Sequence, residues 1–129
     1  MALVVRAFPL KPGTTPADVQ KFVDELKGAR NHDVCAMHAA HGVTHESWYL
    51  QETPQGYWVI AVDHAEGDVN ESARAFGEEN TGFTGWFKQR ILELTGVDTS
   101  QAPLGPPTIP IYEWSCDEET RVKFEPFSM

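Results

Sequence analysis

The sequence predicts a single α+β domain in which helices cover one face of a four-stranded antiparallel sheet. Short runs rich in β-branched and aromatic residues alternate with segments of helical periodicity. Two of the strand-like runs follow each other at hairpin spacing, whereas the others are separated by helical segments. The 129 residues are 41% hydrophobic and 22% charged, which is typical of an ordinary globular domain.

The first strand and the first helix have clear sequence signals. Residues 2–10 are mostly apolar and end at a Lys-Pro-Gly turn, which predicts a strand. Thr15 and Pro16 then provide a helix cap and a first-turn proline, and Asp18 places an acid near the positive end of the helix. The predicted helix has one apolar stripe, formed by Val19, Phe22, Val23, Leu26 and Ala29.

A second helical piece and a hairpin are expected to follow. The piece covers residues 32–42 and ends at Gly42. Residues 43–50 and 57–64 then predict two strands joined across Gln-Glu-Thr-Pro-Gln-Gly, so that an antiparallel pair forms.

The last third of the chain predicts two more helices and an edge strand. One helix begins at Asp68 and ends near Gly77, and Thr84 is expected to cap another that ends before Gly96. Residues 108–115 predict the final strand, which Pro110 restricts to a sheet edge because proline donates no hydrogen bond. We therefore divide the chain into a domain over residues 1–115 and a polar C-terminal arm over residues 116–129.

The resulting order, β-α-β-β-α-β, is the ferredoxin-like topology, with both helical regions on one face of the sheet. The strands are apolar on both sides, as the runs Leu3-Val4-Val5 and Val59-Ile60-Ala61 show. Strands that are apolar on both faces need a second cover, which a monomer with one helical layer lacks. We therefore expect a homodimer joined through the helix-free face.

Several segments resemble the dimeric α+β barrel superfamily and, within it, a bacterial family of uncharacterised function. The resemblance covers residues 2–115 and rests on VVRAFPLKPG, GVTHESWYL, YWVIAVDH and TIPIYEW. It implies the fold and the dimer; superfamily members include monooxygenases, small isomerases and decarboxylases. Heme-degrading members typically carry an asparagine on the first strand and a histidine on the second main helix. Residues 2–10 contain no Asn and residues 68–96 no His, so the resemblance does not imply heme.

Charge and composition argue against several partners. The net charge of −9 repels nucleic acid and anionic membrane surfaces. No run of 18 apolar residues and no leader pattern is present, so we expect no membrane partner and a cytoplasmic location. Cys35 and Cys116 are expected to stay reduced. No dinucleotide, phosphate-loop or nucleophile-elbow motif occurs, and we expect no cofactor.

The histidines are concentrated in one stretch of the chain. All five lie within residues 32–64, and His38 and His41 are spaced to share one face of a helix. Such a pair can bind a metal, and a metal site over His32–His45 is one hypothesis. The spacing lacks a supporting carboxylate at the offset of a metal motif, so we predict no tightly held metal.

The candidate site residues lie in an aromatic setting. His45 and Glu46 are adjacent on a strand and point to opposite faces, so one of them must be buried if both faces are covered. We name these two as candidate catalytic residues. The candidate ligand-binding residues are aromatic or imidazole side chains from this strand and from other elements: Trp48, Trp58, His64, Trp86 and Tyr112. The structural alternative is an ion pair, for example of Arg6 with Glu46 or Glu113, that sets the strand register.

Three functions remain open on these grounds. The first is a homodimeric binding protein that holds a small, partly aromatic metabolite between sheet and helices. The second is a cofactor-independent monooxygenase or isomerase in which His45 or Glu46 removes a proton. The third is a metal protein that uses the histidine cluster.

Overall fold

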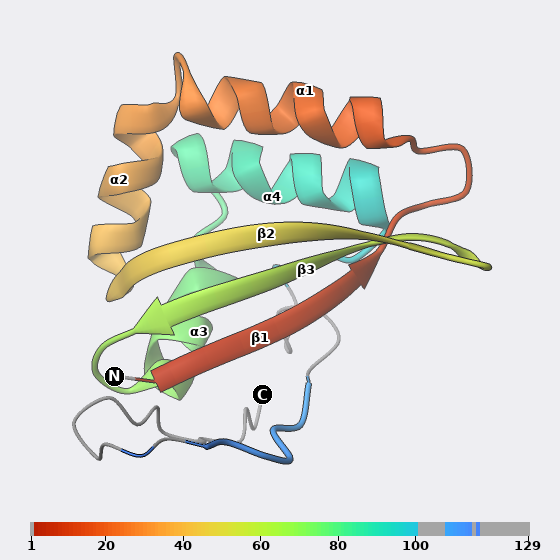
Figure 1. Cartoon of the computed structure of the whole chain (residues 1–129). Coiled ribbons are helices and arrows are strands. Elements are labelled where there is room, and N and C mark those ends of the chain that lie inside the picture. The colour runs from red at the N-terminus through yellow and green to blue at the C-terminus, as the bar shows by residue number, and fades with distance from the viewer. Residues whose placement is uncertain (1, 101–107, 115, 117–129) are drawn as a thin grey trace.

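The computed structural model describes residues 2–100, 108–114 and 116 (Figure 1). It confirms an α+β fold with an antiparallel sheet. The elements follow in the order β1 (Ala2–Pro9), α1 (Pro16–Lys27), α2 (Asn31–Ala40), β2 (Val43–Thr53), β3 (Gly56–Ala65), α3 (Val69–Glu78) and α4 (Gly82–Thr95).

The sheet has three strands in the described part of the chain, in the order β1-β3-β2, and both pairings are antiparallel. β3 lies in the centre, where Asp63 is opposite Val4 on β1 and opposite Glu46 on β2. The predicted hairpin is confirmed, but its connection is shorter than expected. β2 continues to Thr53 and β3 begins at Gly56, whose positive φ of 120° suits a residue without a side chain.

The helices pack on the sheet through an aromatic core. Figure 1 shows α1 and α4 running alongside each other over the strands, with α2 standing at one end. Phe22 from α1, Met37 from α2 and Phe87 from α4 are all buried and form one cluster. A smaller cluster of Ala2, Ala65 and Val69 joins the sheet to α3. Val19 and Phe22 of the apolar stripe predicted for the first helix are buried, and Val23 and Leu26 are half-buried, whereas Ala29 follows the end of α1 and is exposed.

The start of α1 agrees with the sequence prediction, whereas the start of α4 does not. The Thr15 hydroxyl and the Asp18 carboxylate form a reciprocal capping box around the first turn of α1. The predicted cap of α4, Thr84, lies instead inside the helix, because α4 begins at Gly82 after Thr81. Thr84 is buried, and its hydroxyl donates to a carboxylate oxygen of Glu79 at 3.1 Å.

The predicted fourth strand is absent from the described residues. Residues 108–114 have no strand pairing, and the sheet ends at β1. One link between this segment and the sheet is a hydrogen bond from the Thr108 hydroxyl to the Val5 carbonyl of β1. Ile109 and Ile111 are 81% and 91% exposed. The predicted C-terminal arm, residues 116–129, lies outside the described residues except for Cys116.

No helix among the described residues combines the length and apolar character needed to cross a membrane.

Candidate functional site

A cavity of about 160 Å³ lies between the sheet and the helices. Its walls come from all three strands and from all four helices. Most lining side chains are apolar, among them Val4, Phe8, Phe22, Met37, Trp48, Val59, Ala61, Val69, Phe76, Phe87 and Ile91. The cavity therefore has the apolar, partly aromatic lining that is typical of small-molecule sites.

Each of the three strands contributes one ionisable side chain to this apolar wall. Alternation along β1 turns Arg6 toward the helices together with Val4, and alternation along β3 does the same for Asp63. Glu46 comes from β2, two residues before Trp48. These three polar groups are collected on the face that the helices cover, where ionisable groups require partners.

Glu46 has such partners on several sides. Its Oε1 lies 2.9 Å from Nε2 of His38 on α2, and the two side chains are only 20% and 22% exposed. Burial alone would raise the pKa of the Glu46 carboxyl. Hydrogen bonds from His38, Asp63 and Trp48, together with the charge of His38, lower it by more than burial raises it. The pKa of Glu46 therefore lies below its usual value. Glu46 is therefore a carboxylate at neutral pH.

Asp63 has the opposite character, although it is directly opposite Glu46 in the sheet. Burial, a hydrogen bond to Glu46 and the negative charge of Glu46 raise the pKa of Asp63 to about 9, against a smaller lowering effect of Arg6. Burial in turn lowers the pKa of Arg6 to about 10, which leaves the guanidinium charged at neutral pH. The two carboxyl groups thus share one proton, which resides on Asp63.

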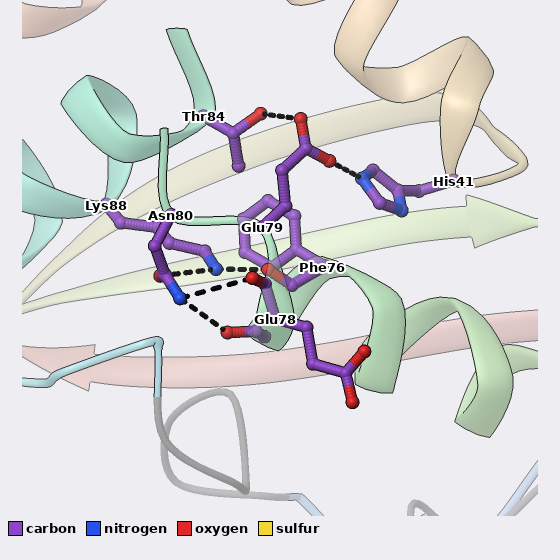
Figure 2. Close-up of polar contacts among 8 residues, drawn as sticks. His41, Phe76, Glu78, Glu79, Asn80, Thr84 and Lys88 are labelled. Carbon is purple, nitrogen blue, oxygen red and sulfur yellow. Dashed lines mark hydrogen bonds and ion pairs between the residues drawn. The ribbon is translucent and has the colours of Figure 1, made fainter. Parts of the chain in front are cut away.

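A second polar group closes the cavity where α2, α3 and α4 meet (Figure 2). Nε2 of His41 lies 3.1 Å from Oε2 of Glu79, and the other oxygen of Glu79 accepts from Thr84. The His41 ring also packs edge-on against Phe76, with the ring centroids 5.4 Å apart. Because His41 and Phe76 both line the cavity, this group fixes the wall that α3 contributes.

Lys88 stabilises the same junction from α4 (Figure 2). The side chain is buried, and its ammonium donates to the Phe76 carbonyl and, at 3.2 Å, to the side-chain oxygen of Asn80. The ammonium also lies 4.5 Å from the centroid of the Phe76 ring. The buried ammonium of Lys88 therefore supplies a hydrogen-bond donor to a carbonyl at the end of α3 and holds Phe76 in place.

The structure separates the predicted site residues into two groups. Glu46 and Trp48 line the cavity. His45 does not line it: its ring meets that of His64 at a centroid distance of 5.0 Å, and it borders a separate open groove beside α1 and α2. The alternation of β3 places His64 and Trp58 on the sheet face away from the helices.

The other two predicted aromatic residues lie elsewhere. Trp86 packs against Phe22 and Phe83 and under the guanidinium of Arg30, 4.5 Å from the ring centroid, so it belongs to the core behind the cavity. Tyr112 is 76% exposed in the segment 108–114.

The histidine cluster is dispersed over different partners. His38 contacts Glu46, His41 contacts Glu79, and His45 contacts His64. Within the residues that the structure describes, no three His, Cys, Asp or Glu side chains come together as a metal site would need.

Arg6, His38 and Asp63 line the cavity but were not named as catalytic or ligand-binding candidates, although Arg6 entered the ion-pair alternative and His38 the metal hypothesis. The strand positions of Arg6 and Asp63 were visible in the sequence, since Arg6 interrupts an apolar run and Asp63 follows one. The pairing of Asp63 with Glu46 depends on the strand register, which follows from the short hairpin connection. The register includes an irregularity between Val43 and His45, and this irregularity decides which face receives Glu46.

Comparisons of the chain with protein-family models, with curated proteins and with solved structures give no match.

Proposed function

We propose that this protein binds a small, partly aromatic metabolite in the cavity between the sheet and the helices. The observation that carries this proposal is an apolar space of about 160 Å³ that borders directly on the buried Arg6 and the half-buried Glu46 and Asp63. An apolar cavity of about 150 Å³ is known to accept benzene, so the volume suits one ring.

A purely structural role for Arg6, Glu46 and Asp63 would not explain the open volume beside them. A pair that serves only to fix the strand register needs no open volume beside it, and close packing normally fills such space. Buried charges also contribute little net stability compared with apolar residues of the same shape. Polar groups at the wall of an apolar cavity are instead the usual means of orienting a ligand.

Calorimetric titration with toluene and phenol tests whether the cavity accepts a single ring. The variant Ala61→Leu adds a bulky side chain to the buried cavity wall and should abolish binding. Ala17→Leu makes the same change at an exposed position of α1 and should leave binding unchanged. Absence of binding of every single-ring probe to the folded wild-type protein would refute the proposal.

The second candidate function is proton transfer without a cofactor, with Glu46 as the base. It is favoured by the proton that Glu46 and Asp63 share beside the cavity, because an ionised base and a protonated acid are then both at hand. Cyclohexanone has exchangeable hydrogens and the size of one ring. Its deuterium uptake from D₂O, followed by NMR, should be accelerated by the wild-type protein and not by Glu46→Gln. Equal rates in both would exclude this candidate.

We also propose that the protein is a ferredoxin-like homodimer of the dimeric α+β barrel kind. The contact between Thr108 and Val5 supports a place for residues 108–114 at the open edge of β1, as the fourth strand requires. Tyr49, 59% exposed, and the half-buried Val62 give the helix-free face the apolar character that a partner would cover. The free thiols of Cys35 and Cys116 are consistent with the reducing cytoplasm, where we place the protein.

A further inference from the structure

Three buried polar atoms on the cavity residues have no hydrogen-bond partner in the described part of the chain. They are Oδ1 of Asp63, Nδ1 of His41 and Oγ1 of Thr99. A buried polar atom without a partner costs free energy, and most such atoms in folded proteins are satisfied. Three of them around one cavity indicate that a bound molecule supplies the missing hydrogen bonds.

In the neutral form of its ring, His41 presents its open atom as an acceptor. The Glu79 carboxylate can only accept, so Nε2 of His41 must donate across their 3.1 Å contact. In a neutral imidazole the remaining nitrogen, Nδ1, is then an acceptor. The His41 side chain is only 10% exposed, and Thr84 holds Glu79 from the other side (Figure 2). The acceptor is therefore buried and fixed in direction.

The open atom of Asp63 is an acceptor as well. Two carboxyl groups form a hydrogen bond only when one carries a proton, and here Asp63 donates to Glu46. When Oδ2 makes this bond, Oδ1, which has no partner among the described residues, is left open. Oδ1 is then the carbonyl oxygen of a carboxylic acid, which accepts.

These assignments restrict the chemistry of the ligand. We infer that the cavity takes an uncharged single-ring molecule carrying hydroxyl or amino groups, which donate to Oδ1 of Asp63 and Nδ1 of His41. This inference rests on the proposed function. An aromatic carboxylate would offer no donor to either acceptor and would bring a second negative charge close to the ionised Glu46. A plain hydrocarbon ring would fill the volume and leave both acceptors unsatisfied.

Calorimetric titration of the full chain with toluene, phenol and benzoate at pH 7 tests the inference. Phenol should bind about tenfold more tightly than toluene, which is what one buried hydrogen bond supplies, and benzoate should bind more weakly than either. Equal binding of phenol and toluene would overturn the inference and leave the proposed function standing, and so would tighter binding of benzoate. Failure of all three probes would remove the proposed function together with the inference.

Two variants assign the acceptors, with a third as control. His41→Phe keeps the ring against Phe76 and removes the nitrogen, and Asp63→Leu removes the carboxyl oxygen. The preference for phenol over toluene should fall to about one in at least one of them. His45→Phe makes the same change on a histidine outside the cavity and should keep the preference. If Asp63→Leu does not fold, the probe series on the wild-type protein and His41→Phe decide the matter. A preference that survives in both variants would overturn the inference.

Discussion

Glu46 and Asp63 lie opposite each other on adjacent strands, and the Asp63 carboxyl donates a hydrogen bond to the Glu46 carboxylate. Two ionised carboxylates at this position would repel each other across the strand pair. Burial and the partners of Glu46 instead hold one group ionised and the other protonated. The pair therefore adds one negative charge to a cavity wall that also contains Arg6 and His38.

The first prediction concerns the pH dependence of stability. In the folded protein the pKa of Asp63 is raised to about 9, so the stability that its proton provides is complete below the ordinary pKa of 3.8 and is lost as pH rises through 9. The free energy of unfolding from Asp63 should therefore fall between pH 6 and 9, by at most about 1.4 kcal/mol per pH unit. Urea denaturation at several pH values measures the slope.

Asp63→Asn is the matched variant for this slope. The amide keeps the shape and still donates to Glu46, but it cannot release a proton in this range. The decline between pH 6 and 9 should shrink in the variant. An unchanged decline would show that another group causes it.

The second prediction concerns the hydrogen bonds around Glu46. Glu46→Ala leaves the donors on His38, Asp63 and Trp48 without their common acceptor and enlarges the cavity. We expect a loss of about 3 kcal/mol in the free energy of unfolding, as for other broken buried pairs. Glu52→Ala removes an exposed carboxylate from the same strand and should cost much less. Equal losses, measured by urea denaturation, would contradict the description of the Glu46 environment.

The third prediction concerns Lys88, which joins α4 to the end of α3. Lys88→Met keeps the length of the side chain and removes the donor to the Phe76 carbonyl and to Asn80. The buried carbonyl then lacks this hydrogen bond, and we expect a loss of about 1 to 3 kcal/mol. Lys21→Met, at an exposed site on α1, is the control and should change the thermal midpoint little. A neutral Lys88→Met variant would show that the contact contributes nothing.

The sequence predicts most of the fold because local signals agree with the tertiary structure. Thr15, Pro16 and Asp18 mark the start of α1, and Gly96 has the left-handed conformation expected after a helix. The prediction that Thr84 caps α4 was wrong, because a threonine near a helix start resembles a cap. This threonine is instead buried, and its hydroxyl donates a hydrogen bond to the Glu79 carboxylate. The strand predicted over residues 108–115 depends on partners beyond the local sequence, and local propensity cannot supply them.

The candidate site was predictable only in part. Alternation shows that His45 and Glu46 point to opposite faces, but the bulge-like irregularity after Val43 decides which face each one takes. Asp63 resembled an ordinary acid at a strand end. Its protonated state arises from burial and from Glu46, and both depend on the register of strands that are distant along the chain.

The fourth prediction concerns self-association through the helix-free face of the sheet. Val62 lies on this face, because its neighbours Ala61 and Asp63 line the cavity on the other. Sedimentation equilibrium at micromolar concentration should give twice the chain mass of 14.4 kDa for the wild-type protein. Val62→Lys should lower the mass to that of one chain, because a buried and unpaired ammonium at an apolar interface is costly. Gln20→Lys adds the same charge on the exposed side of α1 and should leave the dimer intact. A wild-type protein of 14.4 kDa would contradict the proposed pairing, and a dimer that persists in Val62→Lys would place its interface elsewhere.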